Sequence, residues 1–510
     1  MNEPGKPNPS ASATNIHIFV SAHTNVGKTA LLRTLLGRDV GVVEDAPDIT
    51  TITTSHELVV GSDGGALLIW DSPGFGDSFR LAKRFRLRHR WLAWMVREMW
   101  DRYRNPSLWR SQRLALDLRA RADVVLYPVS LLERPIDAVY VAPELEVLGW
   151  AGKPVLVILN QGGALLNNGD AAIRVAEWRT ALATHPVVQS VIDLDAFTRC
   201  WLQELMLFEE IGRLLPNASR PRYQQLADGL ALAYVDRFDA SVAAIADYLM
   251  QVAADGVDLD TRWFSGVTDA VELIRDKLPW GKSNERRPAE LAMEALAQRF
   301  AECTKDLANQ LVAVNRLDGV SSAEVLQVAT EQLCVNGPLS KSTSSLVGGV
   351  VSGVLTGLTA DLMAGGLTLG TGALVGGVLG ALGGAAIAEG YNVLRSKGKK
   401  VIRWSPRSVV EALDNSVLLY LSVAHFGRGQ GTWRKKAVPT QWSAVVDQVL
   451  KGYQDRLDQM WGARDLQANV SRVRAEHTLL VGNVLRDVLI CLYPKESGAL
   501  SAKKPVWEQK

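Results

Sequence analysis

The chain has 510 residues, a hydrophobic content of 47% and a formal net charge of +2. This length allows about three domains, and the hydrophobic content supplies a large core. The near-neutral charge excludes a strong whole-chain attraction to nucleic acid. The four cysteines are scattered without a CxxC pair, which excludes a zinc finger or a disulfide framework and fits a reducing compartment. Residues 1–14 are polar, lack the apolar segment of a signal peptide and predict a disordered tail.

The first structured stretch predicts a strand, a loop and a helix. An apolar run at 16–20 precedes the loop, and a helical pattern at 30–36 follows it. In phosphate-binding loops that end in G-K-[ST], the lysine contacts the β- and γ-phosphates, the hydroxyl ligates Mg²⁺, and backbone N–H groups bind the phosphate chain. Lys28 and Thr29 would take these roles, and we expect His23 to be a polar contact on the phosphate side. Ala22 replaces the first glycine of the full pattern. The loop consists of Ala22, His23, Thr24, Asn25, Val26, Gly27, Lys28 and Thr29.

Five further strands are predicted after this loop. Residues 56–60 and 66–70 flank a glycine-rich turn, and the second run ends in Asp71-Ser72-Pro73-Gly74. An aspartate at the end of a buried strand can hold Mg²⁺ through water, and the Gly74 N–H can reach a γ-phosphate. Strand-like runs at 123–129, 154–160 and 191–194 alternate with helical patterns. The alternation predicts a doubly wound, mostly parallel α/β sheet.

These motifs carry a family resemblance. The NVGKT loop, Thr50 with Thr51, and DSPG resemble the P-loop, switch I and switch II of Era-like GTPases. The resemblance implies a P-loop GTPase domain over residues 15–215 that binds GTP and Mg²⁺. It places Thr29, Thr50, Thr51 and Asp71 at the metal, and Lys28, Thr50, Thr51 and Gly74 at the reacting phosphate.

The base-reading motif of that family is altered here. Asn160-Gln161-Gly162-Gly163 stands where the family has N-K-x-D, and backbone groups near Asp195 and Ala196 stand where its last nucleotide loop lies. Because Gly163 has no carboxylate to pair with guanine, we expect weaker guanine selectivity.

Two residues bear on hydrolysis. Phe75 stands where Ras-like proteins carry the glutamine that orients water, so we expect slow intrinsic hydrolysis. Asn25 matches the asparagine that helps hold K⁺ in K⁺-dependent relatives. The alternative is that Asn25 only shapes the loop.

Residues 78–121 form a basic, aromatic insert in the predicted GTPase domain. They include thirteen Arg or Lys, three acidic residues and a tryptophan-rich stripe at helical spacing. Such a helix is typical of membrane surfaces. The alternatives are a helix that packs its tryptophans on a neighbouring domain, and a nucleic-acid contact.

Past about Leu215 the strand patterns stop, and helical patterns predict all-α regions at 216–340 and 401–495, followed by a tail at 496–510. The expected helices span 224–254, 260–277, 289–317, 322–335, 408–425, 442–460 and 466–492. Between these regions, residues 341–400 predict a glycine-rich apolar hairpin. Its runs 342–360 and 362–388 carry no charge, and glycines recur every four residues. Basic flanks fit a membrane hairpin with both ends in the cytoplasm; a buried hairpin in a soluble protein is the alternative.

The whole pattern resembles bacterial proteins with a GTPase domain joined to a helical domain of unknown function, and its layout is similar to that of dynamin-like membrane GTPases. We expect a GTP-binding, slowly hydrolysing switch or remodeller at the cytoplasmic face of a membrane. Mg²⁺ is the expected cofactor, and K⁺ is a hypothesis for a second one. A homodimer through the GTPase domains is a separate hypothesis about partners. Nucleic acid is an unlikely partner on this interpretation. The alternatives are a non-hydrolysing, nucleotide-gated binding module and an RNA- or ribosome-associated Era-like GTPase.

Overall fold

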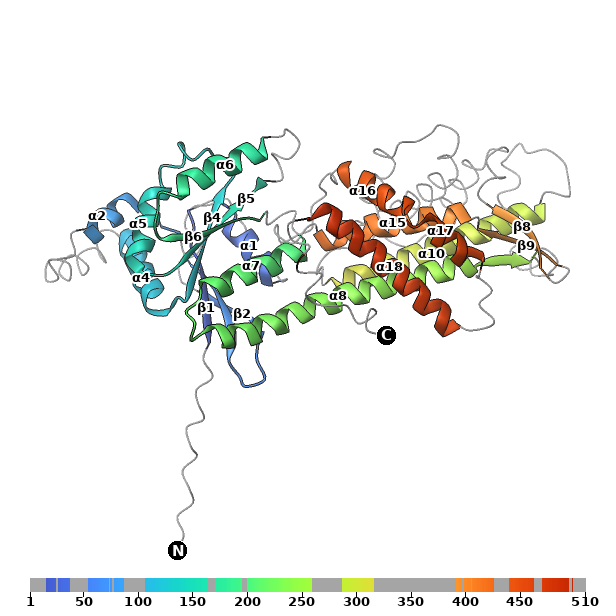
Figure 1. Ribbon diagram of the computed structural model, residues 1–510, viewed down its shortest axis with the longest axis horizontal. Helices are drawn as coiled ribbons and strands as arrows, with labels where there is room; N and C mark the ends of the chain where they lie inside the picture. The colour runs from blue at the N-terminus through green and yellow to red at the C-terminus, as the bar shows by residue number, and fades with distance from the viewer. Residues whose placement is uncertain are drawn as a thin grey trace, which may run out of the picture. The chain divides into compact units, whose positions relative to one another are not determined.

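The structure is a computed structural model that describes residues 15–23, 26–36, 54–72, 74–75, 78–86, 106–162, 170–194, 200–258, 287–315, 391–396, 399–404, 406–425, 440–462, 470–494 and 498. The chain divides into two compact units (Figure 1). The first comprises residues 1–236 with 425–434, and the second comprises residues 237–424 with 435–510.

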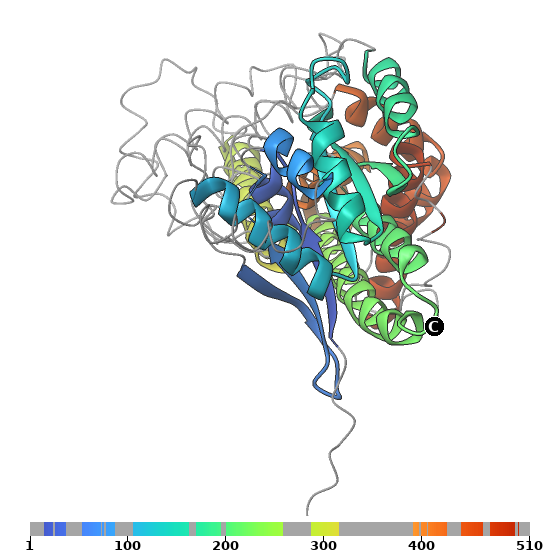
Figure 2. The ribbon, with the colours of Figure 1, turned by 90° about the vertical axis from the view of Figure 1, so that its left-hand side faces the viewer.

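A six-stranded sheet forms the centre of the first unit (Figure 2). Its order is β2-β3-β1-β4-β5-β6; β2 runs antiparallel to β3, and the other neighbouring strands are parallel. The strands are β1 (Ile16–Val20), β2 (Thr54–Val60), β3 (Ala66–Asp71), β4 (Val124–Ser130), β5 (Val155–Asn160) and β6 (Val188–Asp193). The predicted α/β class with a mostly parallel sheet is therefore confirmed.

Helices lie on both faces of this sheet (Figure 1). They are α1 (Lys28–Leu36), α2 (Ser78–Arg86), α4 (Pro106–Arg121), α5 (Val141–Ala151), α6 (Ala171–Leu182) and α7 (Trp201–Leu214). Side chains of Phe19, Tyr127 and Val157 on one face of the strands share a buried core with α2, α4, α5 and α6. Ile18, Leu126 and Leu156 point the other way and are also fully buried. Burial on both faces explains the continuous apolar runs of β4 and β5.

The two described ends of the basic insert belong to the first unit. Leu108, Leu114 and Leu118 of α4 are buried in its core. Two arginines of α4 lie over tryptophan rings of the same unit: Arg119 over Trp150 and Arg121 over Trp70. The structure therefore shows that the two described ends of the insert pack within the first unit. Residues 87–105, which hold most of the predicted tryptophan stripe, lie outside the described residues.

Long helices make up most of the second unit. They are α8 (Arg220–Ala254), whose first half belongs to the first unit, α10 (Arg287–Val314), α15 (Pro406–His425), α16 (Thr440–Lys451), α17 (Gln454–Gly462) and α18 (Val470–Leu492). The mainly helical C-terminal region is confirmed. One predicted helix, 442–460, is divided into α16 and α17 at Gly452 and Tyr453, whose N–H groups bond the carbonyls of Val449 and Leu450. The helices expected at 260–277 and 322–335 lie outside the described residues.

The prediction that strands stop past Leu215 was wrong. The second unit holds a small antiparallel sheet of β7 (Gly256–Asp258), β9 (Lys399–Trp404) and β8 (Tyr391–Ser396), in that order. Ile402 and Trp404 are buried at 0% and 4% exposure, which makes alternate residues of β9 apolar and inward-facing. Most of the last ten residues of the predicted hairpin at 341–400 therefore belong to strands, with residues 391–396 in β8 and residues 399–400 in β9.

The apolar part of the predicted hairpin, 342–390, lies outside the described residues, as do the tails 1–14 and 499–510. In the part of the chain that the structure describes, no helix is both long and apolar enough to cross a bilayer.

Candidate phosphate-binding site

The phosphate loop connects β1 to α1 at the carboxyl edge of the sheet. After Val20, the N–H of Ser21 donates to the carbonyl of Leu126 on β4 at 3.0 Å, which holds the chain on the sheet for one more residue. The chain then turns, and Lys28 is the first residue of α1. This is the strand, loop and helix that the sequence predicts. A helix N-terminus at the end of the loop presents free N–H groups and a partial positive charge to an anion.

The polar side chains of the loop end at Thr29. The next residue, Ala30, is a buried residue of α1 that is 6% exposed. The methyl group of Ala30 packs in the core and has no oxygen to offer a metal ion or a phosphate. Thr29 is therefore the last residue of the loop whose side chain can ligate Mg²⁺.

Position 27 requires glycine for two reasons, the conformation of its backbone and the lack of room for a Cβ. Its φ is +87°, a region that disfavours residues with a Cβ. A Cβ at this position would lie 2.5 Å from Nδ2 of Asn160, too close for any real contact. The loop backbone and the Asn160 side chain therefore pack directly against each other.

Asn160 braces the loop from the end of β5. It is fully buried, and its Nδ2 donates to the carbonyl of Val26 at 2.8 Å. The next residue, Gln161, has a φ of +63° and accepts a hydrogen bond from the Ser130 hydroxyl through Oε1. The sequence predicted Asn160 and Gln161 as part of a base-reading motif. The bracing role of Asn160 was missed, although an asparagine that ends a buried strand beside the loop signals it.

The structure brings Lys28 and Asp71 together. The Lys28 ammonium contacts Oδ1 of Asp71, and the side chains are 12% and 9% exposed. Asp71 pairs in register with Val20, the last residue of β1, and the hydroxyl of the neighbouring Ser72 donates to the Val20 carbonyl at 2.7 Å. The parallel pairing of β1 and β3 thus places a cation and a carboxylate at the start of α1.

Phe75 points into the core and away from solvent. Its side chain is 1% exposed and packs in the same cluster as Leu81 and Phe19. A buried phenyl ring has no group that can orient water. Gly74, which the sequence places at the γ-phosphate, precedes it at the end of the DSPG segment.

His23 contacts a helix that the sequence did not connect to the loop. Its Nδ1 lies 2.8 Å from Oε1 of Glu144 on α5, and its ring stacks on Tyr140 with centroids 3.9 Å apart. The other carboxylate oxygen of Glu144 accepts a hydrogen bond from the hydroxyl of Tyr127 at 2.6 Å. The structure adds this contact with α5, and the expected contact of His23 with the phosphate side stays a prediction. Glu144 stands three residues after Val141 and four before Leu148, and this helical spacing among apolar residues was the available signal for a buried carboxylate.

Several predicted site residues lie outside the described residues: Thr24, Asn25, Thr50, Thr51, Gly163, Asp195 and Ala196. Their roles remain predictions. The described residues fit a Mg²⁺-bound nucleoside triphosphate. Gly27 lets the loop backbone turn closely against Asn160, Lys28 supplies a cation at a helix N-terminus, and Thr29 and Asp71 supply the oxygen donors that Mg²⁺ prefers.

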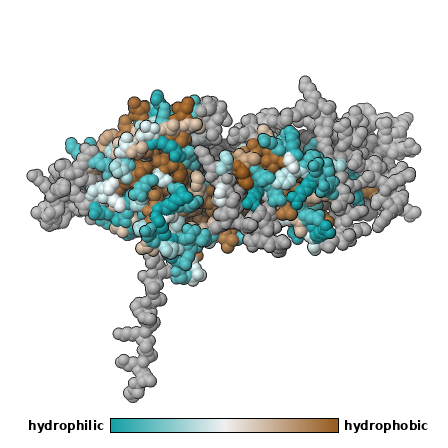
Figure 3. Space-filling model, viewed as in Figure 1, coloured by the Kyte–Doolittle hydropathy of each residue, from teal (hydrophilic) through white to brown (hydrophobic). Residues whose placement is uncertain are grey.

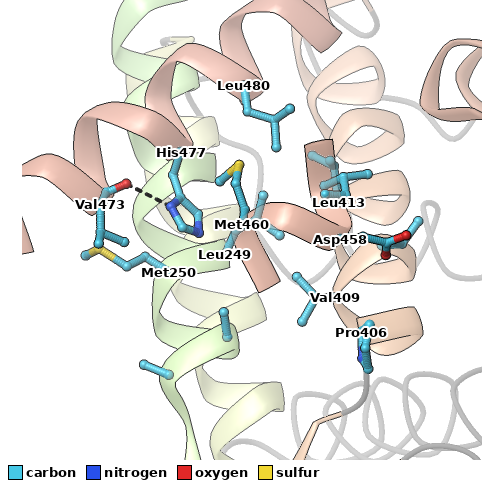
Figure 4. A pocket seen from close by; sticks show the side chains of 14 residues that line it. Leu249, Met250, Pro406, Val409, Leu413, Asp458, Met460, Val473, His477 and Leu480 are labelled. Carbon is cyan, nitrogen blue, oxygen red and sulfur yellow. Dashed lines mark hydrogen bonds between the residues drawn. The ribbon is translucent and has the colours of Figure 1, made fainter. Parts of the chain in front are cut away.

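Two hollows lie elsewhere in the described parts of the chain. In the first unit, whose visible face mixes hydrophilic and hydrophobic residues (Figure 3), a groove of about 1250 Å³ runs between α2, α5 and the start of β6. None of its described lining residues belongs to the phosphate loop. In the second unit, a cavity of about 30 Å³ lies among α8, α15, α17 and α18 (Figure 4). It is apolar apart from Asp458 and His477, and it has room for about one water molecule, which excludes a nucleotide.

Comparison with known structures gives distant similarities. A crystal structure of Era with MgGDPNP and a segment of 16S ribosomal RNA is 18% identical, with a TM-score of 0.29, over 40% of this chain and 58% of that one. A variant of Era from Aquifex aeolicus bound to GDP·AlF4⁻ is 20% identical, with a TM-score of 0.27, over 39% and 57%. A bacterial selenocysteine-specific elongation factor is 15% identical, with a TM-score of 0.24, over 36% and 26%. The chain thus spans less than two thirds of each of these proteins. Among curated proteins, none matches the chain significantly.

Two protein families match the chain. Residues 17–161 match the family described as 50S ribosome-binding GTPase, and residues 179–479 match a domain of unknown function, DUF3482. The first match covers the phosphate loop, Asp71 and Asn160, so the first unit carries a GTP-binding P-loop GTPase domain. Because the first family is described as ribosome-binding, the expectation that nucleic acid is an unlikely partner finds no support here. The second match extends over more than half of the chain, which therefore belongs to the DUF3482 family, with a P-loop GTPase domain preceding the helical region.

Proposed function

We propose that this protein is a GTP-dependent switch that hydrolyses GTP slowly on its own and faster with a partner. The observation that carries the proposal is the phosphate site itself. Lys28 and Asp71 meet at the start of α1, while Phe75, the residue after DSPG, is buried and has no polar group. Bound Mg²⁺ would neutralise charge on the phosphates, and Thr29 and Asp71 are the described residues that would hold it. The group that accelerates GTP hydrolysis then has to come from a partner protein, from a second copy of this chain or from K⁺ bound near Asn25.

Turnover measurements test this proposal. Phosphate release from GTP is measured in Na⁺ and in K⁺ buffer across a range of protein concentrations. Lys28→Ala, which removes the phosphate-contacting cation, is the control for contaminating hydrolases. We expect slow release that Lys28→Ala abolishes and that K⁺ or higher protein concentration increases. Fast release that is indifferent to both variables contradicts the proposal, and so does an affinity for GTP that is the same in Lys28→Ala as in the wild type.

We further propose that the switch works at the cytoplasmic face of a membrane. Support comes from the sequence of residues 342–360 and 362–388, two uncharged runs with glycines every four residues, flanked by basic residues. Asp361 between the runs would stay at the far interface, since a carboxylate at the bilayer centre costs roughly 3 kcal/mol or more.

Fractionation of cells tests the location. We expect full-length protein in the membrane pool after an alkaline carbonate wash, and a variant lacking residues 342–390 that still binds GTP but is found in the soluble pool. Complete release of the full-length protein by carbonate refutes a stably inserted hairpin.

The description of the matched GTPase family favours a second candidate, a ribosome-associated switch. GTP-dependent co-sedimentation with ribosomal subunits, unchanged by the 342–390 deletion, would support that candidate instead.

A further inference from the structure

A buried carboxylate lies in the first turn of α5. The Glu144 side chain is 0% exposed, and each of its oxygens has a partner on a different element. Oε2 accepts a hydrogen bond from the Tyr127 hydroxyl of β4 at 2.6 Å, and Oε1 lies 2.8 Å from Nδ1 of His23 in the phosphate loop. One side chain therefore joins α5 to the preceding strand and to the phosphate loop, which is 121 residues away in the sequence.

This network is not needed to fill space in the core. Burial raises the pKa of Glu144, while its hydrogen bonds with His23 and Tyr127 oppose that rise. A buried polar group carries a desolvation cost, and apolar side chains of similar volume often stabilise a fold equally well. What hydrogen bonds add is direction, because they fix the orientation of the groups that they join.

The orientation that is fixed here is that of the loop. Nδ1 of His23 faces Glu144, and its ring stacks on Tyr140 at an interplanar angle of 14°. The Tyr140 hydroxyl is itself held by Oε2 of Glu133 at 2.7 Å. At the other end of the loop, the Val26 carbonyl is held by Asn160. Side chains from α5 and β5 thus hold His23 and Val26, two residues of the loop that would bind phosphate under the proposed function.

We propose that Glu144 and Tyr127 are positioning residues for GTP binding, which act through His23 on the conformation of the phosphate loop. The inference deepens the proposed function because it rests on the same nucleotide site. It is independent of hydrolysis, of the partner and of the membrane.

The decisive variant replaces the network by apolar groups: His23→Leu, Tyr127→Phe and Glu144→Leu together. The affinities for fluorescent GTP and GDP analogues and the thermal midpoint are measured for this variant and for the wild type. We expect a folded protein whose affinities fall about ten- to hundredfold, the scale on which supporting residues affect a bound ligand. The matched control is Tyr234→Phe with Glu204→Leu, another buried tyrosine–glutamate pair, which joins α8 to α7. This control should leave the affinities unchanged.

A second pair of variants separates positioning from folding. His23→Leu removes the polar contact to Glu144, whereas His23→Asn keeps a polar atom near the place of Nδ1. We expect His23→Leu to lose affinity and His23→Asn to recover most of it. Equal affinities for the wild type, His23→Leu and the triple variant overturn the inference while leaving GTP binding intact. Failure of the wild type to bind GTP overturns the proposed function itself.

Discussion

Substitution of the loop glycine by alanine tests the geometry of the phosphate site most directly. Two costs are expected for Gly27→Ala. The first is backbone strain, since a φ of +87° costs a residue with a Cβ about 1–2 kcal/mol. The second is displacement of Asn160, whose Nδ2 would lie 2.5 Å from the new Cβ. Losing its buried bond to the Val26 carbonyl costs about 1–3 kcal/mol, so the free energy of unfolding should fall by about 2–5 kcal/mol in all.

Gly64→Ala is the matched control. Gly64 has nearly the same φ, +83°, but nothing lies within 4 Å of a Cβ placed there. This variant should carry the strain of about 1–2 kcal/mol alone. Because Gly64 lies in the turn between β2 and β3, its substitution should leave GTP affinity unchanged.

Urea unfolding and titration with a fluorescent GTP analogue measure the two quantities. Gly27→Ala should be less stable than Gly64→Ala by about 1–3 kcal/mol and should bind GTP at least about tenfold more weakly, because the loop moves with Asn160. Equal stabilities and equal affinities for the two variants would refute the contact between the Gly27 backbone and Asn160 as a determinant of the site.

Three further predictions concern charge. Lys28→Ala should weaken GTP binding by about 10- to 150-fold, the value of a charge-assisted hydrogen bond of about 1.5–3 kcal/mol, whereas the exposed Lys451→Ala should not; titration of both variants measures this. ATP should compete with labelled GTP at less than about a thousandfold excess, or about 4 kcal/mol, because Gly163 replaces the guanine-specifying aspartate; a larger GTP preference would contradict the prediction. Burial, with the charge of Asp447 second, raises the pKa of Asp414 from 3.8 to about 7, so its stabilising contribution is complete below pH 4 and is lost as the pH rises to about 7. Relative to the wild type, Asp414→Asn should therefore gain about 3 kcal/mol of stability as the pH rises from 5 to 8, since each pH unit between 5 and the raised pKa changes the difference by about 1.4 kcal/mol. Urea unfolding at both pH values checks this, and an unchanged difference between the two proteins would argue against the titration.

Local patterns were sufficient for the parts of the site that lie next to their own strand. The apolar run before Ser21 and the run that ends at Asp71 each predict a buried strand with polar residues at its end. Parallel pairing then brings those ends together, as the register of Val20 with Asp71 shows. Strand β6 was harder to place. The sequence predicted it at 191–194 and the structure has it at 188–193, because this edge strand begins with the polar residues Gln189 and Ser190.

Contacts between distant residues could not be predicted in the same way. Glu144 is 121 residues from His23, and nothing in either local pattern indicates their contact. The strands β8 and β9 were missed for a different reason. Their basic residues fitted the expected flank of a membrane hairpin, and the sequence of residues 391–400 has no regular alternation of apolar and polar residues.

The roles that were predicted from the sequence are those of residues that bind phosphate or metal. The roles that were missed are those of residues that orient the loop. Lys28, Thr29 and Asp71 carry charge or oxygen ligands and therefore follow a motif, because the chemistry of a phosphate chain demands these residue types at these positions. Asn160, His23 and Glu144 orient the loop, and any set of side chains with suitable hydrogen-bonding geometry could do so. A motif can therefore reveal that a chain binds GTP without revealing how its loop is held. In this protein that second task is performed by a strand end and a helix start, on β5 and α5, which are adjacent to the loop only after the sheet has formed.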